Sequence, residues 1–455
     1  MAKLKKIDVA TSLFELVKAQ RNHEKWRGEE CINLIASEGC PSPAVKEMYR
    51  ITEDLWHRYA EGENDLRGNP KERHYQGQTY MSIIETVTAE LMRGLFDADF
   101  VDIRPISGTV ANLATFKGLS SATHNHKMVV APVNFGSHIS HDYTGLAGQV
   151  VGLDTIDHAF DLDEMNIDPD ESAKIIRAAK PGIVTFGGSL YLFPHPIKEL
   201  SEVAKEVGAF VVYDAAHVLG LLAGRQFQRP FEEGVDFLTG STHKTFPGPQ
   251  GGIVLARLED RKGNISKRRR SAAQAVQTGV FPLSVSNHHL RRLPALALTA
   301  VEMWAFGEQY AKQTIKNAQK AGEYLYEHGL KVLGEKKGFT MSHQIAVDVK
   351  EHGGGRLVAK NLERANIIVN RNLLPYDDPS KTRDPSGLRI GFQEVTRRGF
   401  KESDIEELCD IMLRVIKGES RSYEELRNET RQLRERFQGI EYGFASVDEA
   451  LSYFS

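Results

Sequence analysis

The chain has 455 residues, of which 41% are hydrophobic and 26% charged, and its formal net charge is −3. This length suits two or three domains, and the composition is ordinary for a globular enzyme. The small net charge argues against bulk attraction to nucleic acid or membranes, and no apolar stretch approaches the roughly 18 residues of a membrane span. Three cysteines fit a reducing cytoplasm without a disulfide framework. We therefore expect a soluble, cytoplasmic protein with no nucleic-acid or membrane partner.

The N-terminal region is expected to form a helical arm, followed by the apolar segment Ile32–Glu38 and a proline-marked turn. A polar, glycine-bearing loop is predicted from Tyr59 to Gln78, and it contains Glu61 and Tyr75. A loop of this length is usually either functional or disordered. Its position between helical segments favours a functional loop.

From about residue 85, apolar runs alternate with helical patterns. The helix predicted over Ile197–Val207 ends at Gly208, a common helix stop. The runs suited to buried strands are Val101–Arg104, Met128–Val133, Gly182–Phe186 and Phe210–Tyr213. This alternation predicts an α/β fold with a mostly parallel sheet and helices on both faces, and ligands bind such sheets beyond the carboxyl ends of the strands.

After residue 290 a long helix is predicted from about Ala295 to His328. A smaller strand-and-helix region follows, in which one helix is expected to open with a capping box at Ser403–Glu406. Cys409 falls on the apolar face of that helix, so we interpret it as a core residue. The last forty residues are rich in arginine and glutamate, and their amphipathic pattern predicts a helix followed by a loosely packed tail. The predicted division is an N-terminal arm (1–60), a large domain (61–290) and a C-terminal domain with its long connecting helix (291–455).

The stretch Asp236–Gly252 carries the strongest chemical signal. A short apolar run ends in Ser241-Thr242-His243-Lys244-Thr245, and glycine- and proline-rich chain follows. A lone lysine is most often a solvated charge. One packed between hydroxyl groups at a strand end could have a lowered pKa and act as an amine nucleophile towards a carbonyl cofactor. A phosphate-binding nucleotide loop would need glycine where His243 stands, so we reject that interpretation.

Two other polar segments follow predicted strands. Ser107–Asn112 opens a helix, where hydroxyls and free backbone amides suit a phosphate, although a plain N-cap explains the motif equally well. Asp214 ends a strand thirty residues before Lys244, a spacing that suits one intervening helix and strand. Its carboxylate could hold a pyridine nitrogen protonated and so make a pyridoxal ring an electron sink. A structural aspartate that caps the next turn is the alternative.

Two histidine pairs occur, His138 with His141 and His288 with His289. Metal binding is disfavoured because no cysteine cluster or HExxH helix accompanies them. A histidine stacked on a cofactor ring, or one packed in the core, is the favoured interpretation. Arg389 lies in a strand-like segment of the small domain, where its planar guanidinium could hold a substrate carboxylate with two hydrogen bonds.

Together these segments resemble the serine hydroxymethyltransferase family, the pyridoxal-phosphate enzymes that interconvert serine and glycine. The resemblance extends from Leu34–Glu38 through Arg58–Gly62 to Thr396–Phe400, and it includes Ser-Thr-His-Lys-Thr with Gly-Pro-Gln-Gly-Gly behind it. It implies the fold type I architecture, with a mostly parallel seven-stranded sheet in the large domain and a smaller α+β C-terminal domain. It also implies a homodimer whose active sites are completed by both chains. The segments similar to the archaeal branch are Gly187–Leu190, Phe193–Pro196, Ser286–His289 and Asn372–Pro375.

The resemblance implies a pyridoxal 5′-phosphate site. Lys244 is implied as the Schiff-base lysine and Asp214 as the partner of the pyridine nitrogen. His138 would stack on the ring, and His217 would lie near its 3′-oxygen. The other implied cofactor-binding residues, among them the phosphate contacts, are Ser107, Gly108, Thr109, Ser241 and His243.

The resemblance also implies substrate contacts. Arg389 and Ser37 would bind the substrate carboxylate. Glu61 and Tyr75 would come from the neighbouring subunit, with Glu61 as the acid/base at the substrate hydroxyl, and Tyr59 would join the substrate site. The one-carbon unit would pass to a tetrahydropterin, and folate or a methanopterin-type carrier are both open.

The chain departs from the resembled pattern at several positions, among them Gln250, where many members have an arginine, and Leu192, where a serine is replaced. Phe281-Pro282 is followed by Leu283–Asn287, where bacterial members carry a glycine-rich phosphate loop. His74 also stands where a tyrosine is common.

Three hypotheses follow for the function. The first is hydroxymethyl transfer between serine, glycine and a tetrahydropterin. The second is an aldolase that cleaves threonine or other β-hydroxy amino acids without a pterin, and the third is a catalytically silent binding or regulatory protein. Retention of Glu61 and Tyr75 favours the first over the second, and intact Lys244, Asp214 and Arg389 count against the third.

Overall fold

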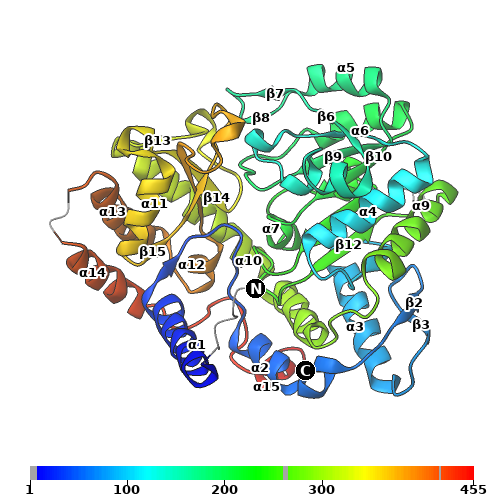
Figure 1. Ribbon diagram of the computed structural model, residues 1–455, viewed down its shortest axis with the longest axis horizontal. Coiled ribbons are helices and arrows are strands. Elements are labelled where there is room, and N and C mark those ends of the chain that lie inside the picture. Colours follow the sequence, from blue (N-terminus) through cyan, green and yellow to red (C-terminus); the bar gives the residue numbers. More distant parts are fainter. Residues whose placement is uncertain (1–7, 260–264, 420–421) are drawn as a thin grey trace, which may run out of the picture.

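The computed structural model describes residues 8–259, 265–419 and 422–455. Its largest sheet has seven strands in the order β4-β12-β11-β10-β9-β5-β6 (Figure 1). Strand β12 runs antiparallel to both its neighbours, and the other neighbouring pairs are parallel. The predicted mostly parallel, seven-stranded sheet is therefore confirmed. The strands are β4 (Phe100–Asp102), β5 (Lys127–Val130), β6 (Asp154–Asp157), β9 (Ile183–Gly187), β10 (Phe210–Asp214), β11 (Phe237–Ser241) and β12 (Gly252–Ala256).

Helices cover both faces of this sheet because side chains alternate along each strand. In β10, Phe210 and Val212 join a core with helices α4 (Gly108–Thr123) and α9 (Lys267–Thr278). Val211 and Tyr213 point the other way, into a second core. Helices α3 (Thr79–Leu95), α6 (Ile197–Glu206) and α7 (Leu219–Ala223) contribute to that second core.

The helix α10 (Arg292–Glu327) joins two cores. Residues in its N-terminal half, such as Leu296 and Met303, pack with the seven-stranded sheet, whereas Ala318 and Leu325 pack in the C-terminal core. In Figure 1 the helix runs between the two units. The domain boundaries at residues 60 and 290 stay a prediction.

The C-terminal unit contains a four-stranded antiparallel sheet in the order β13-β14-β17-β16. Its strands are β13 (Lys331–Val332), β14 (Gln344–Asp348), β16 (Asn370–Asn372) and β17 (Gly387–Gly391). Strand β1 (Ile32–Asn33) pairs in parallel with β15 (Ile367–Ile368), so the segment that follows the N-terminal arm is attached to this unit.

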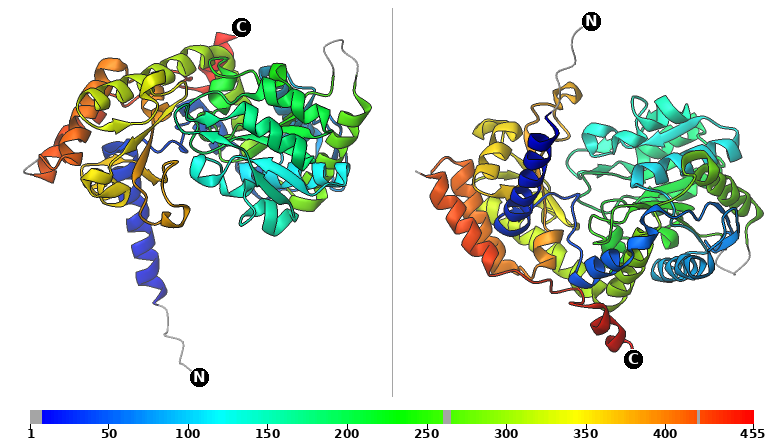
Figure 2. Two further views of the ribbon diagram at one scale, coloured as in Figure 1. Left: turned by 90° about the horizontal axis from the view of Figure 1, so that it is seen from above. Right: turned by 60° about the horizontal axis from the view of Figure 1, so that its bottom comes forward.

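The remaining helices surround these sheets. Helix α1 (Val9–His23) has no buried residue and extends away from the rest of the chain (Figure 2). Among the described residues, no helix combines the length and apolar character needed to span a membrane. The other α-helices are α2 (Pro43–Ile51), α5 (Pro169–Ala179), α8 (Pro230–Glu233), α11 (Gly354–Arg364), α12 (Gln393–Arg397), α13 (Glu402–Ile416), α14 (Tyr423–Glu435) and α15 (Val447–Tyr453).

Two local predictions were wrong. The capping box lies earlier than Ser403–Glu406, because α13 begins at Glu402 and the Asp404 carboxylate accepts a hydrogen bond from the backbone N–H of Lys401 at 2.9 Å. The strand predicted over Met128–Val133 ends at Val130, since Pro132 has no N–H to donate to a sheet. Cys409 is fully buried, as expected of a core residue.

Two segments expected to be irregular are ordered. The predicted loop from Tyr59 to Gln78 contains a hairpin of β2 (Gly62–Asn64) and β3 (Pro70–Arg73). The C-terminal tail is also not loosely packed throughout, because Phe444 is buried in a cluster with residues of α2 and α10.

Phe186 provides a test of the central core. Its side chain is fully buried in β9, and truncation of a buried phenylalanine leaves a cavity. We expect Phe186→Ala to lower the free energy of unfolding by about 3 to 5 kcal/mol, measured by urea denaturation. The matched control is Leu162→Ala, because Leu162 is 51% exposed and its truncation should change stability by no more than about 0.5 kcal/mol. Equal losses in both variants would contradict this assignment of the core.

Candidate active site

A cavity of about 170 Å³ lies at the carboxyl ends of β10 and β11, beside the N-terminus of α4. Ligands bind open α/β sheets at this edge. The structure brings the predicted cofactor-binding residues together here, although their individual roles stay predictions. The lining residues among them are Ser107, Gly108, Thr109, His138, Asp214, His217, Ser241, His243 and Lys244.

Lys244 lies in a turn three residues beyond the end of β11. The next residue fixes that turn: the Thr245 hydroxyl donates to the His217 carbonyl at 2.7 Å and accepts from the Gly220 N–H at 3.0 Å. The Tyr310 hydroxyl donates to the Thr245 carbonyl at 3.0 Å. Burial lowers the pKa of Lys244 to about 8, against the opposing attraction of Asp214. The amine is therefore partly neutral at mildly alkaline pH and can act as a nucleophile.

Asp214 is buried with three hydrogen-bonding groups around its carboxylate. Oδ2 accepts from Asn112 Nδ2 at 2.8 Å and lies 2.9 Å from His141 Nε2. Oδ1 accepts from the Ala216 N–H at 2.9 Å, which is the turn-capping contact weighed as an alternative. Burial alone would raise the pKa of Asp214, but His141 and Asn112 together hold it well below its ordinary value. The carboxylate is therefore an anion in the cavity wall.

Asn112 and His141 were not among the predicted site residues. Thr239 Oγ1 donates to Asn112 Oδ1 at 2.6 Å, which orients the amide so that its N–H₂ faces Asp214. Ser137 Oγ lies 3.1 Å from Nδ1 of His141 and fixes that ring from the other side. Both residues belong to segments singled out in the sequence, Ser107–Asn112 and the pair His138 with His141, but no local pattern linked either of them to Asp214.

Two predicted histidines are held neutral by burial. The pKa of His138 falls to about 4, and its Nδ1 lies 2.7 Å from Ser140 Oγ. The pKa of His217 falls well below its ordinary value. His217 stacks on His343 at 5.7 Å between ring centroids, and its buried Nδ1 has no hydrogen-bond partner among the described residues. A ligand oxygen would satisfy this nitrogen.

The first residues of α4 form the opposite wall of the cavity. Ser107 Oγ accepts from the Val110 N–H at 3.2 Å, so Ser107 is the helix N-cap. A Cβ placed at Gly108 would lie 2.4 Å from Ser241 Oγ, which explains why the start of α4 can approach β11. The N-cap and anion-binding interpretations are compatible, because a helix N-terminus favours a negative ligand.

Ser37 lies in the segment Leu34–Gly39, which touches the lysine turn. A Cβ at Gly39 would lie only 2.3 Å from the carbonyl oxygen of Lys244. Gln393 Nε2 donates to two backbone carbonyls of this segment at 2.7 and 2.6 Å. The segment is thus held by the close approach of Gly39 to Lys244 and by the two hydrogen bonds from Gln393.

Arg389 borders the cavity from strand β17. Its Nη1 donates to the carbonyl of the lining residue Ser189 at 2.8 Å, and its Nε donates to Asn370 Oδ1 at 3.2 Å. Burial lowers the pKa of Arg389 to about 10, so the guanidinium keeps its charge at neutral pH. An anion-binding group therefore stands beside Lys244.

Ser37 and Arg389 lie beside the cavity without lining it, and three further predicted residues do not belong to its lining in this chain either. Glu61 is half-buried next to strand β2, and Tyr59 and Tyr75 are 49% and 44% exposed. The two tyrosine rings lie 5.1 Å apart. The expectation that these residues serve a neighbouring subunit stays a prediction.

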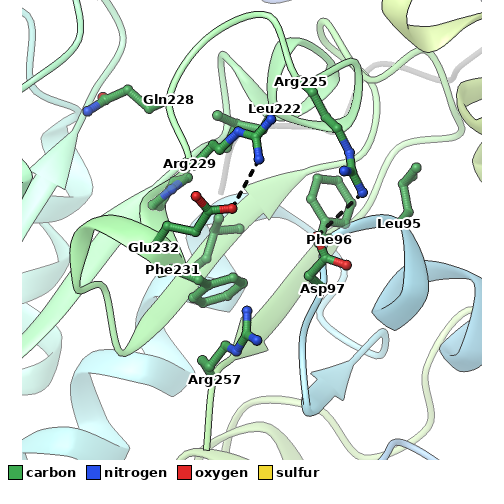
Figure 3. Close-up of a pocket in the computed structure, with 12 residues that line it drawn as sticks. Leu95, Phe96, Asp97, Leu222, Arg225, Gln228, Arg229, Phe231, Glu232 and Arg257 are labelled. Carbon is green, nitrogen blue, oxygen red and sulfur yellow. Dashed lines mark hydrogen bonds and ion pairs between the residues drawn. The ribbon is translucent and has the colours of Figure 1, made fainter. Parts of the chain in front are cut away.

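A second hollow lies elsewhere on the surface and contains none of the predicted residues (Figure 3). Two of its three arginines face carboxylates: Arg225 lies 3.4 Å from Asp97, and Arg229 lies 3.1 Å from Glu232. The described residues also contain no group of three or more histidine, cysteine or acidic side chains that could hold a metal ion.

The pKa of Lys244 makes stability depend on pH. Folding lowers this pKa from 10.5 to about 8, so between these values the folded state binds fewer protons than the unfolded chain. The free energy of unfolding should rise with pH across this interval. Below pH 8 the charged lysine should destabilise the ligand-free fold by about 3 kcal/mol.

We expect Lys244→Met to be more stable than the parent protein at pH 7. The difference should shrink as the pH approaches 10.5, because the parent lysine is then neutral in both states. Urea denaturation of both proteins at a series of pH values measures this. A difference that grows with pH would contradict the lowered pKa.

Comparisons with known proteins identify the family of the chain. The family model described as serine hydroxymethyltransferase matches residues 9–412. A protein of that name from Staphylothermus marinus is 47% identical over 432 residues, which cover 95% of this chain and 93% of that protein. One from Archaeoglobus fulgidus is 48% identical over 424 residues, covering 93% and 91% of the two chains. One from Metallosphaera sedula is 45% identical over 436 residues, covering 96% of each.

These matches confirm the resemblance to the archaeal branch and the fold type I architecture. The enzymes of the matched family interconvert serine and glycine and depend on pyridoxal phosphate, which favours the first functional hypothesis over the aldolase. The chain belongs to the serine hydroxymethyltransferase family.

Proposed function

We propose that this chain interconverts serine and glycine with pyridoxal 5′-phosphate in the cavity beside Lys244 and with a tetrahydropterin as the one-carbon carrier. The observation that carries this proposal is that an amine of lowered pKa, Lys244, and a buried carboxylate, Asp214, line the same cavity. Lys244 has a pKa of about 8, while Asp214 is held as an anion. A nucleophilic amine and a carboxylate for a pyridine nitrogen are the two groups that this cofactor needs.

The other residues of the cavity fit the cofactor as well. The N-terminus of α4 at Ser107, Gly108 and Thr109 suits its phosphate. The unpartnered Nδ1 of His217 suits its 3′-oxygen. When bound, the cofactor supplies an electron sink for bond cleavage at the α-carbon of the amino acid.

The chain's own groups would orient the substrate. Lys244 would hold the cofactor through its neutral amine, and it would serve as a base at the substrate. Arg389 would hold the substrate carboxylate, with Ser37 beside it. His138, neutral at physiological pH because burial lowers its pKa, would stack on the ring without adding charge.

A second subunit would complete the site in a cytoplasmic homodimer. No side chain of the described residues pairs with the Glu61 carboxylate, which leaves it available for a substrate hydroxyl. The exposed apolar side chains of α1 support a partner surface, because large apolar patches mark interaction sites. They are Val9, Leu13, Phe14, Leu16 and Val17.

Lys244→Ala tests the covalent step. We expect the purified parent protein to bind pyridoxal phosphate with a near-visible absorbance band that disappears on reaction with hydroxylamine. The variant should lack this band, because no amine is left to bond the carbonyl carbon. Lys267→Ala is the matched control, since Lys267 is an exposed lysine outside the cavity. A band that persists in Lys244→Ala would contradict the proposal.

The carrier can be identified by exchange of the glycine α-proton. We expect the protein to catalyse exchange of this proton with deuterium, observed by NMR. Tetrahydrofolate or tetrahydromethanopterin, whichever is the carrier, should accelerate it. Indifference of the rate to both pterins would favour the pterin-independent aldolase.

Arg389→Lys tests the substrate contact. Lysine keeps the charge but loses the planar pair of N–H donors. We expect the KM for serine to rise about 10- to 100-fold, because one charge-assisted hydrogen bond to the substrate is lost. The cofactor absorbance should be retained. An unchanged KM would exclude Arg389 as the carboxylate ligand.

A further inference from the structure

The backbone just before Glu61 is held by one asparagine from a distant part of the chain. Asn287 Oδ1 accepts from the N–H of Ala60 at 3.0 Å, and Asn287 Nδ2 donates to the carbonyl of Arg58 at 2.9 Å. Both groups of the amide are therefore used on the residues directly before Glu61. The two partners are more than 220 residues apart in the sequence.

Two arginines hold the backbone directly after Glu61. Arg104 Nη1 donates to the carbonyl of Gly62 at 3.0 Å, and Arg73 Nη1 donates to the carbonyl of Glu63 at 2.8 Å. The carbonyl of Glu61 itself accepts from the N–H of His74 at 3.1 Å. Side chains therefore hold backbone groups both before and after Glu61.

A buried charge cluster supports these contacts. Arg73 Nη2 lies 2.8 Å from Glu85 Oε1, with both side chains at most 2% exposed. His288 Nε2 lies 3.0 Å from the same oxygen. Removing Arg73 or Glu85 would leave the other buried charge without its partner, which is costly. The segment that carries Asn287 is thereby tied to α3, which carries Glu85, and to the hairpin.

The two histidines that follow Asn287 differ in their exposure to solvent. His288 is 2% exposed, whereas His289 is exposed and has no hydrogen bond or ion pair in the described chain. Only His288 of this histidine pair points inward, so the two rings do not face a common site. Asn287 lies in the segment where the chain departs from the glycine-rich loop of the resembled bacterial pattern.

We propose that Asn287 is a positioning residue for Glu61, and that the Arg73–Glu85–His288 cluster supports it. The inference rests on the proposed acid/base role of Glu61. Its backbone is fixed on both sides while its carboxylate is left unpaired by the described residues, the arrangement expected of a preorganised functional group. Asn287 acts on the proton-transfer group and leaves the cofactor cavity untouched.

The first test compares Asn287→Ala with His289→Ala. We expect kcat for serine cleavage to fall about 10- to 100-fold in Asn287→Ala, because a misplacement of about 1 Å costs on the order of 100-fold. KM and the cofactor absorbance should stay near the parent values, since no cavity residue is altered. His289→Ala should leave all three unchanged. A parent-like kcat in Asn287→Ala would overturn the proposal.

A double-mutant cycle with Glu61→Gln separates positioning from general damage. If Asn287 acts through Glu61, adding Asn287→Ala to Glu61→Gln should lower kcat by no more than about twofold. The full single-variant loss in the Glu61→Gln background would overturn the proposal. A parent-like kcat in Glu61→Gln would refute the proposed role of Glu61 and the positioning proposal with it. An impaired Glu61→Gln beside a parent-like Asn287→Ala would overturn the positioning proposal alone.

Amide hydrogen exchange provides a readout that does not need turnover. We expect Asn287→Ala to accelerate exchange in the peptide that contains Ala60 at least tenfold, and His289→Ala to leave it unchanged. Asn287→Asp is a milder second variant, because it keeps the acceptor for the Ala60 N–H and loses only the donor to Arg58. Its kcat should lie between those of the parent protein and Asn287→Ala. Unchanged exchange in both Asn287 variants would overturn the proposal.

Discussion

The arrangement of the cavity depends on the burial of the Asp214 carboxylate. An ionised carboxylate can be buried only if its lost hydration is replaced by hydrogen bonds or charges. Here the replacements come from Asn112 on α4, from His141 in the turn after β5, and from the backbone at Ala216. The strand end, the helix start and the turn are therefore fixed relative to one another, and the remaining groups of the cavity are positioned by these elements.

The two cations near this anion respond differently to burial. Desolvation lowers the pKa of Lys244 to about 8 and that of Arg389 to about 10. At neutral pH the arginine therefore remains a permanent cation, while the lysine can exchange its proton within the working range. The same low-polarity surroundings thus produce one group suited to holding an anion and one suited to nucleophilic chemistry.

Local patterns predicted much of the fold but fewer of its polar contacts. Strands β4, β5, β9, β10 and β11 and the helix α10 follow from apolar runs and glycine stops, and Lys244, Asp214 and Ser107 follow strands as the pattern predicted. The β2–β3 hairpin was missed because its polar strands lack an apolar alternation. Arg73 in that hairpin is instead stabilised by Glu85 on α3. Asn112 was missed as a partner of Asp214 because the two are 102 residues apart.

The contact between Gly39 and the carbonyl of Lys244 has a mechanical consequence. The segment that ends at Gly39 pairs through β1 with β15, and Gln393 donates hydrogen bonds to two of its carbonyls. The segment therefore belongs to the C-terminal unit. The lysine turn belongs to the seven-stranded sheet. Because no side chain lies between the two backbones, no side chain can change its rotamer to accommodate a movement of one unit. If one unit tilted towards the other, the backbone of Gly39 would collide with the carbonyl of Lys244. This backbone contact therefore limits how closely the two units can approach beside the reacting amine.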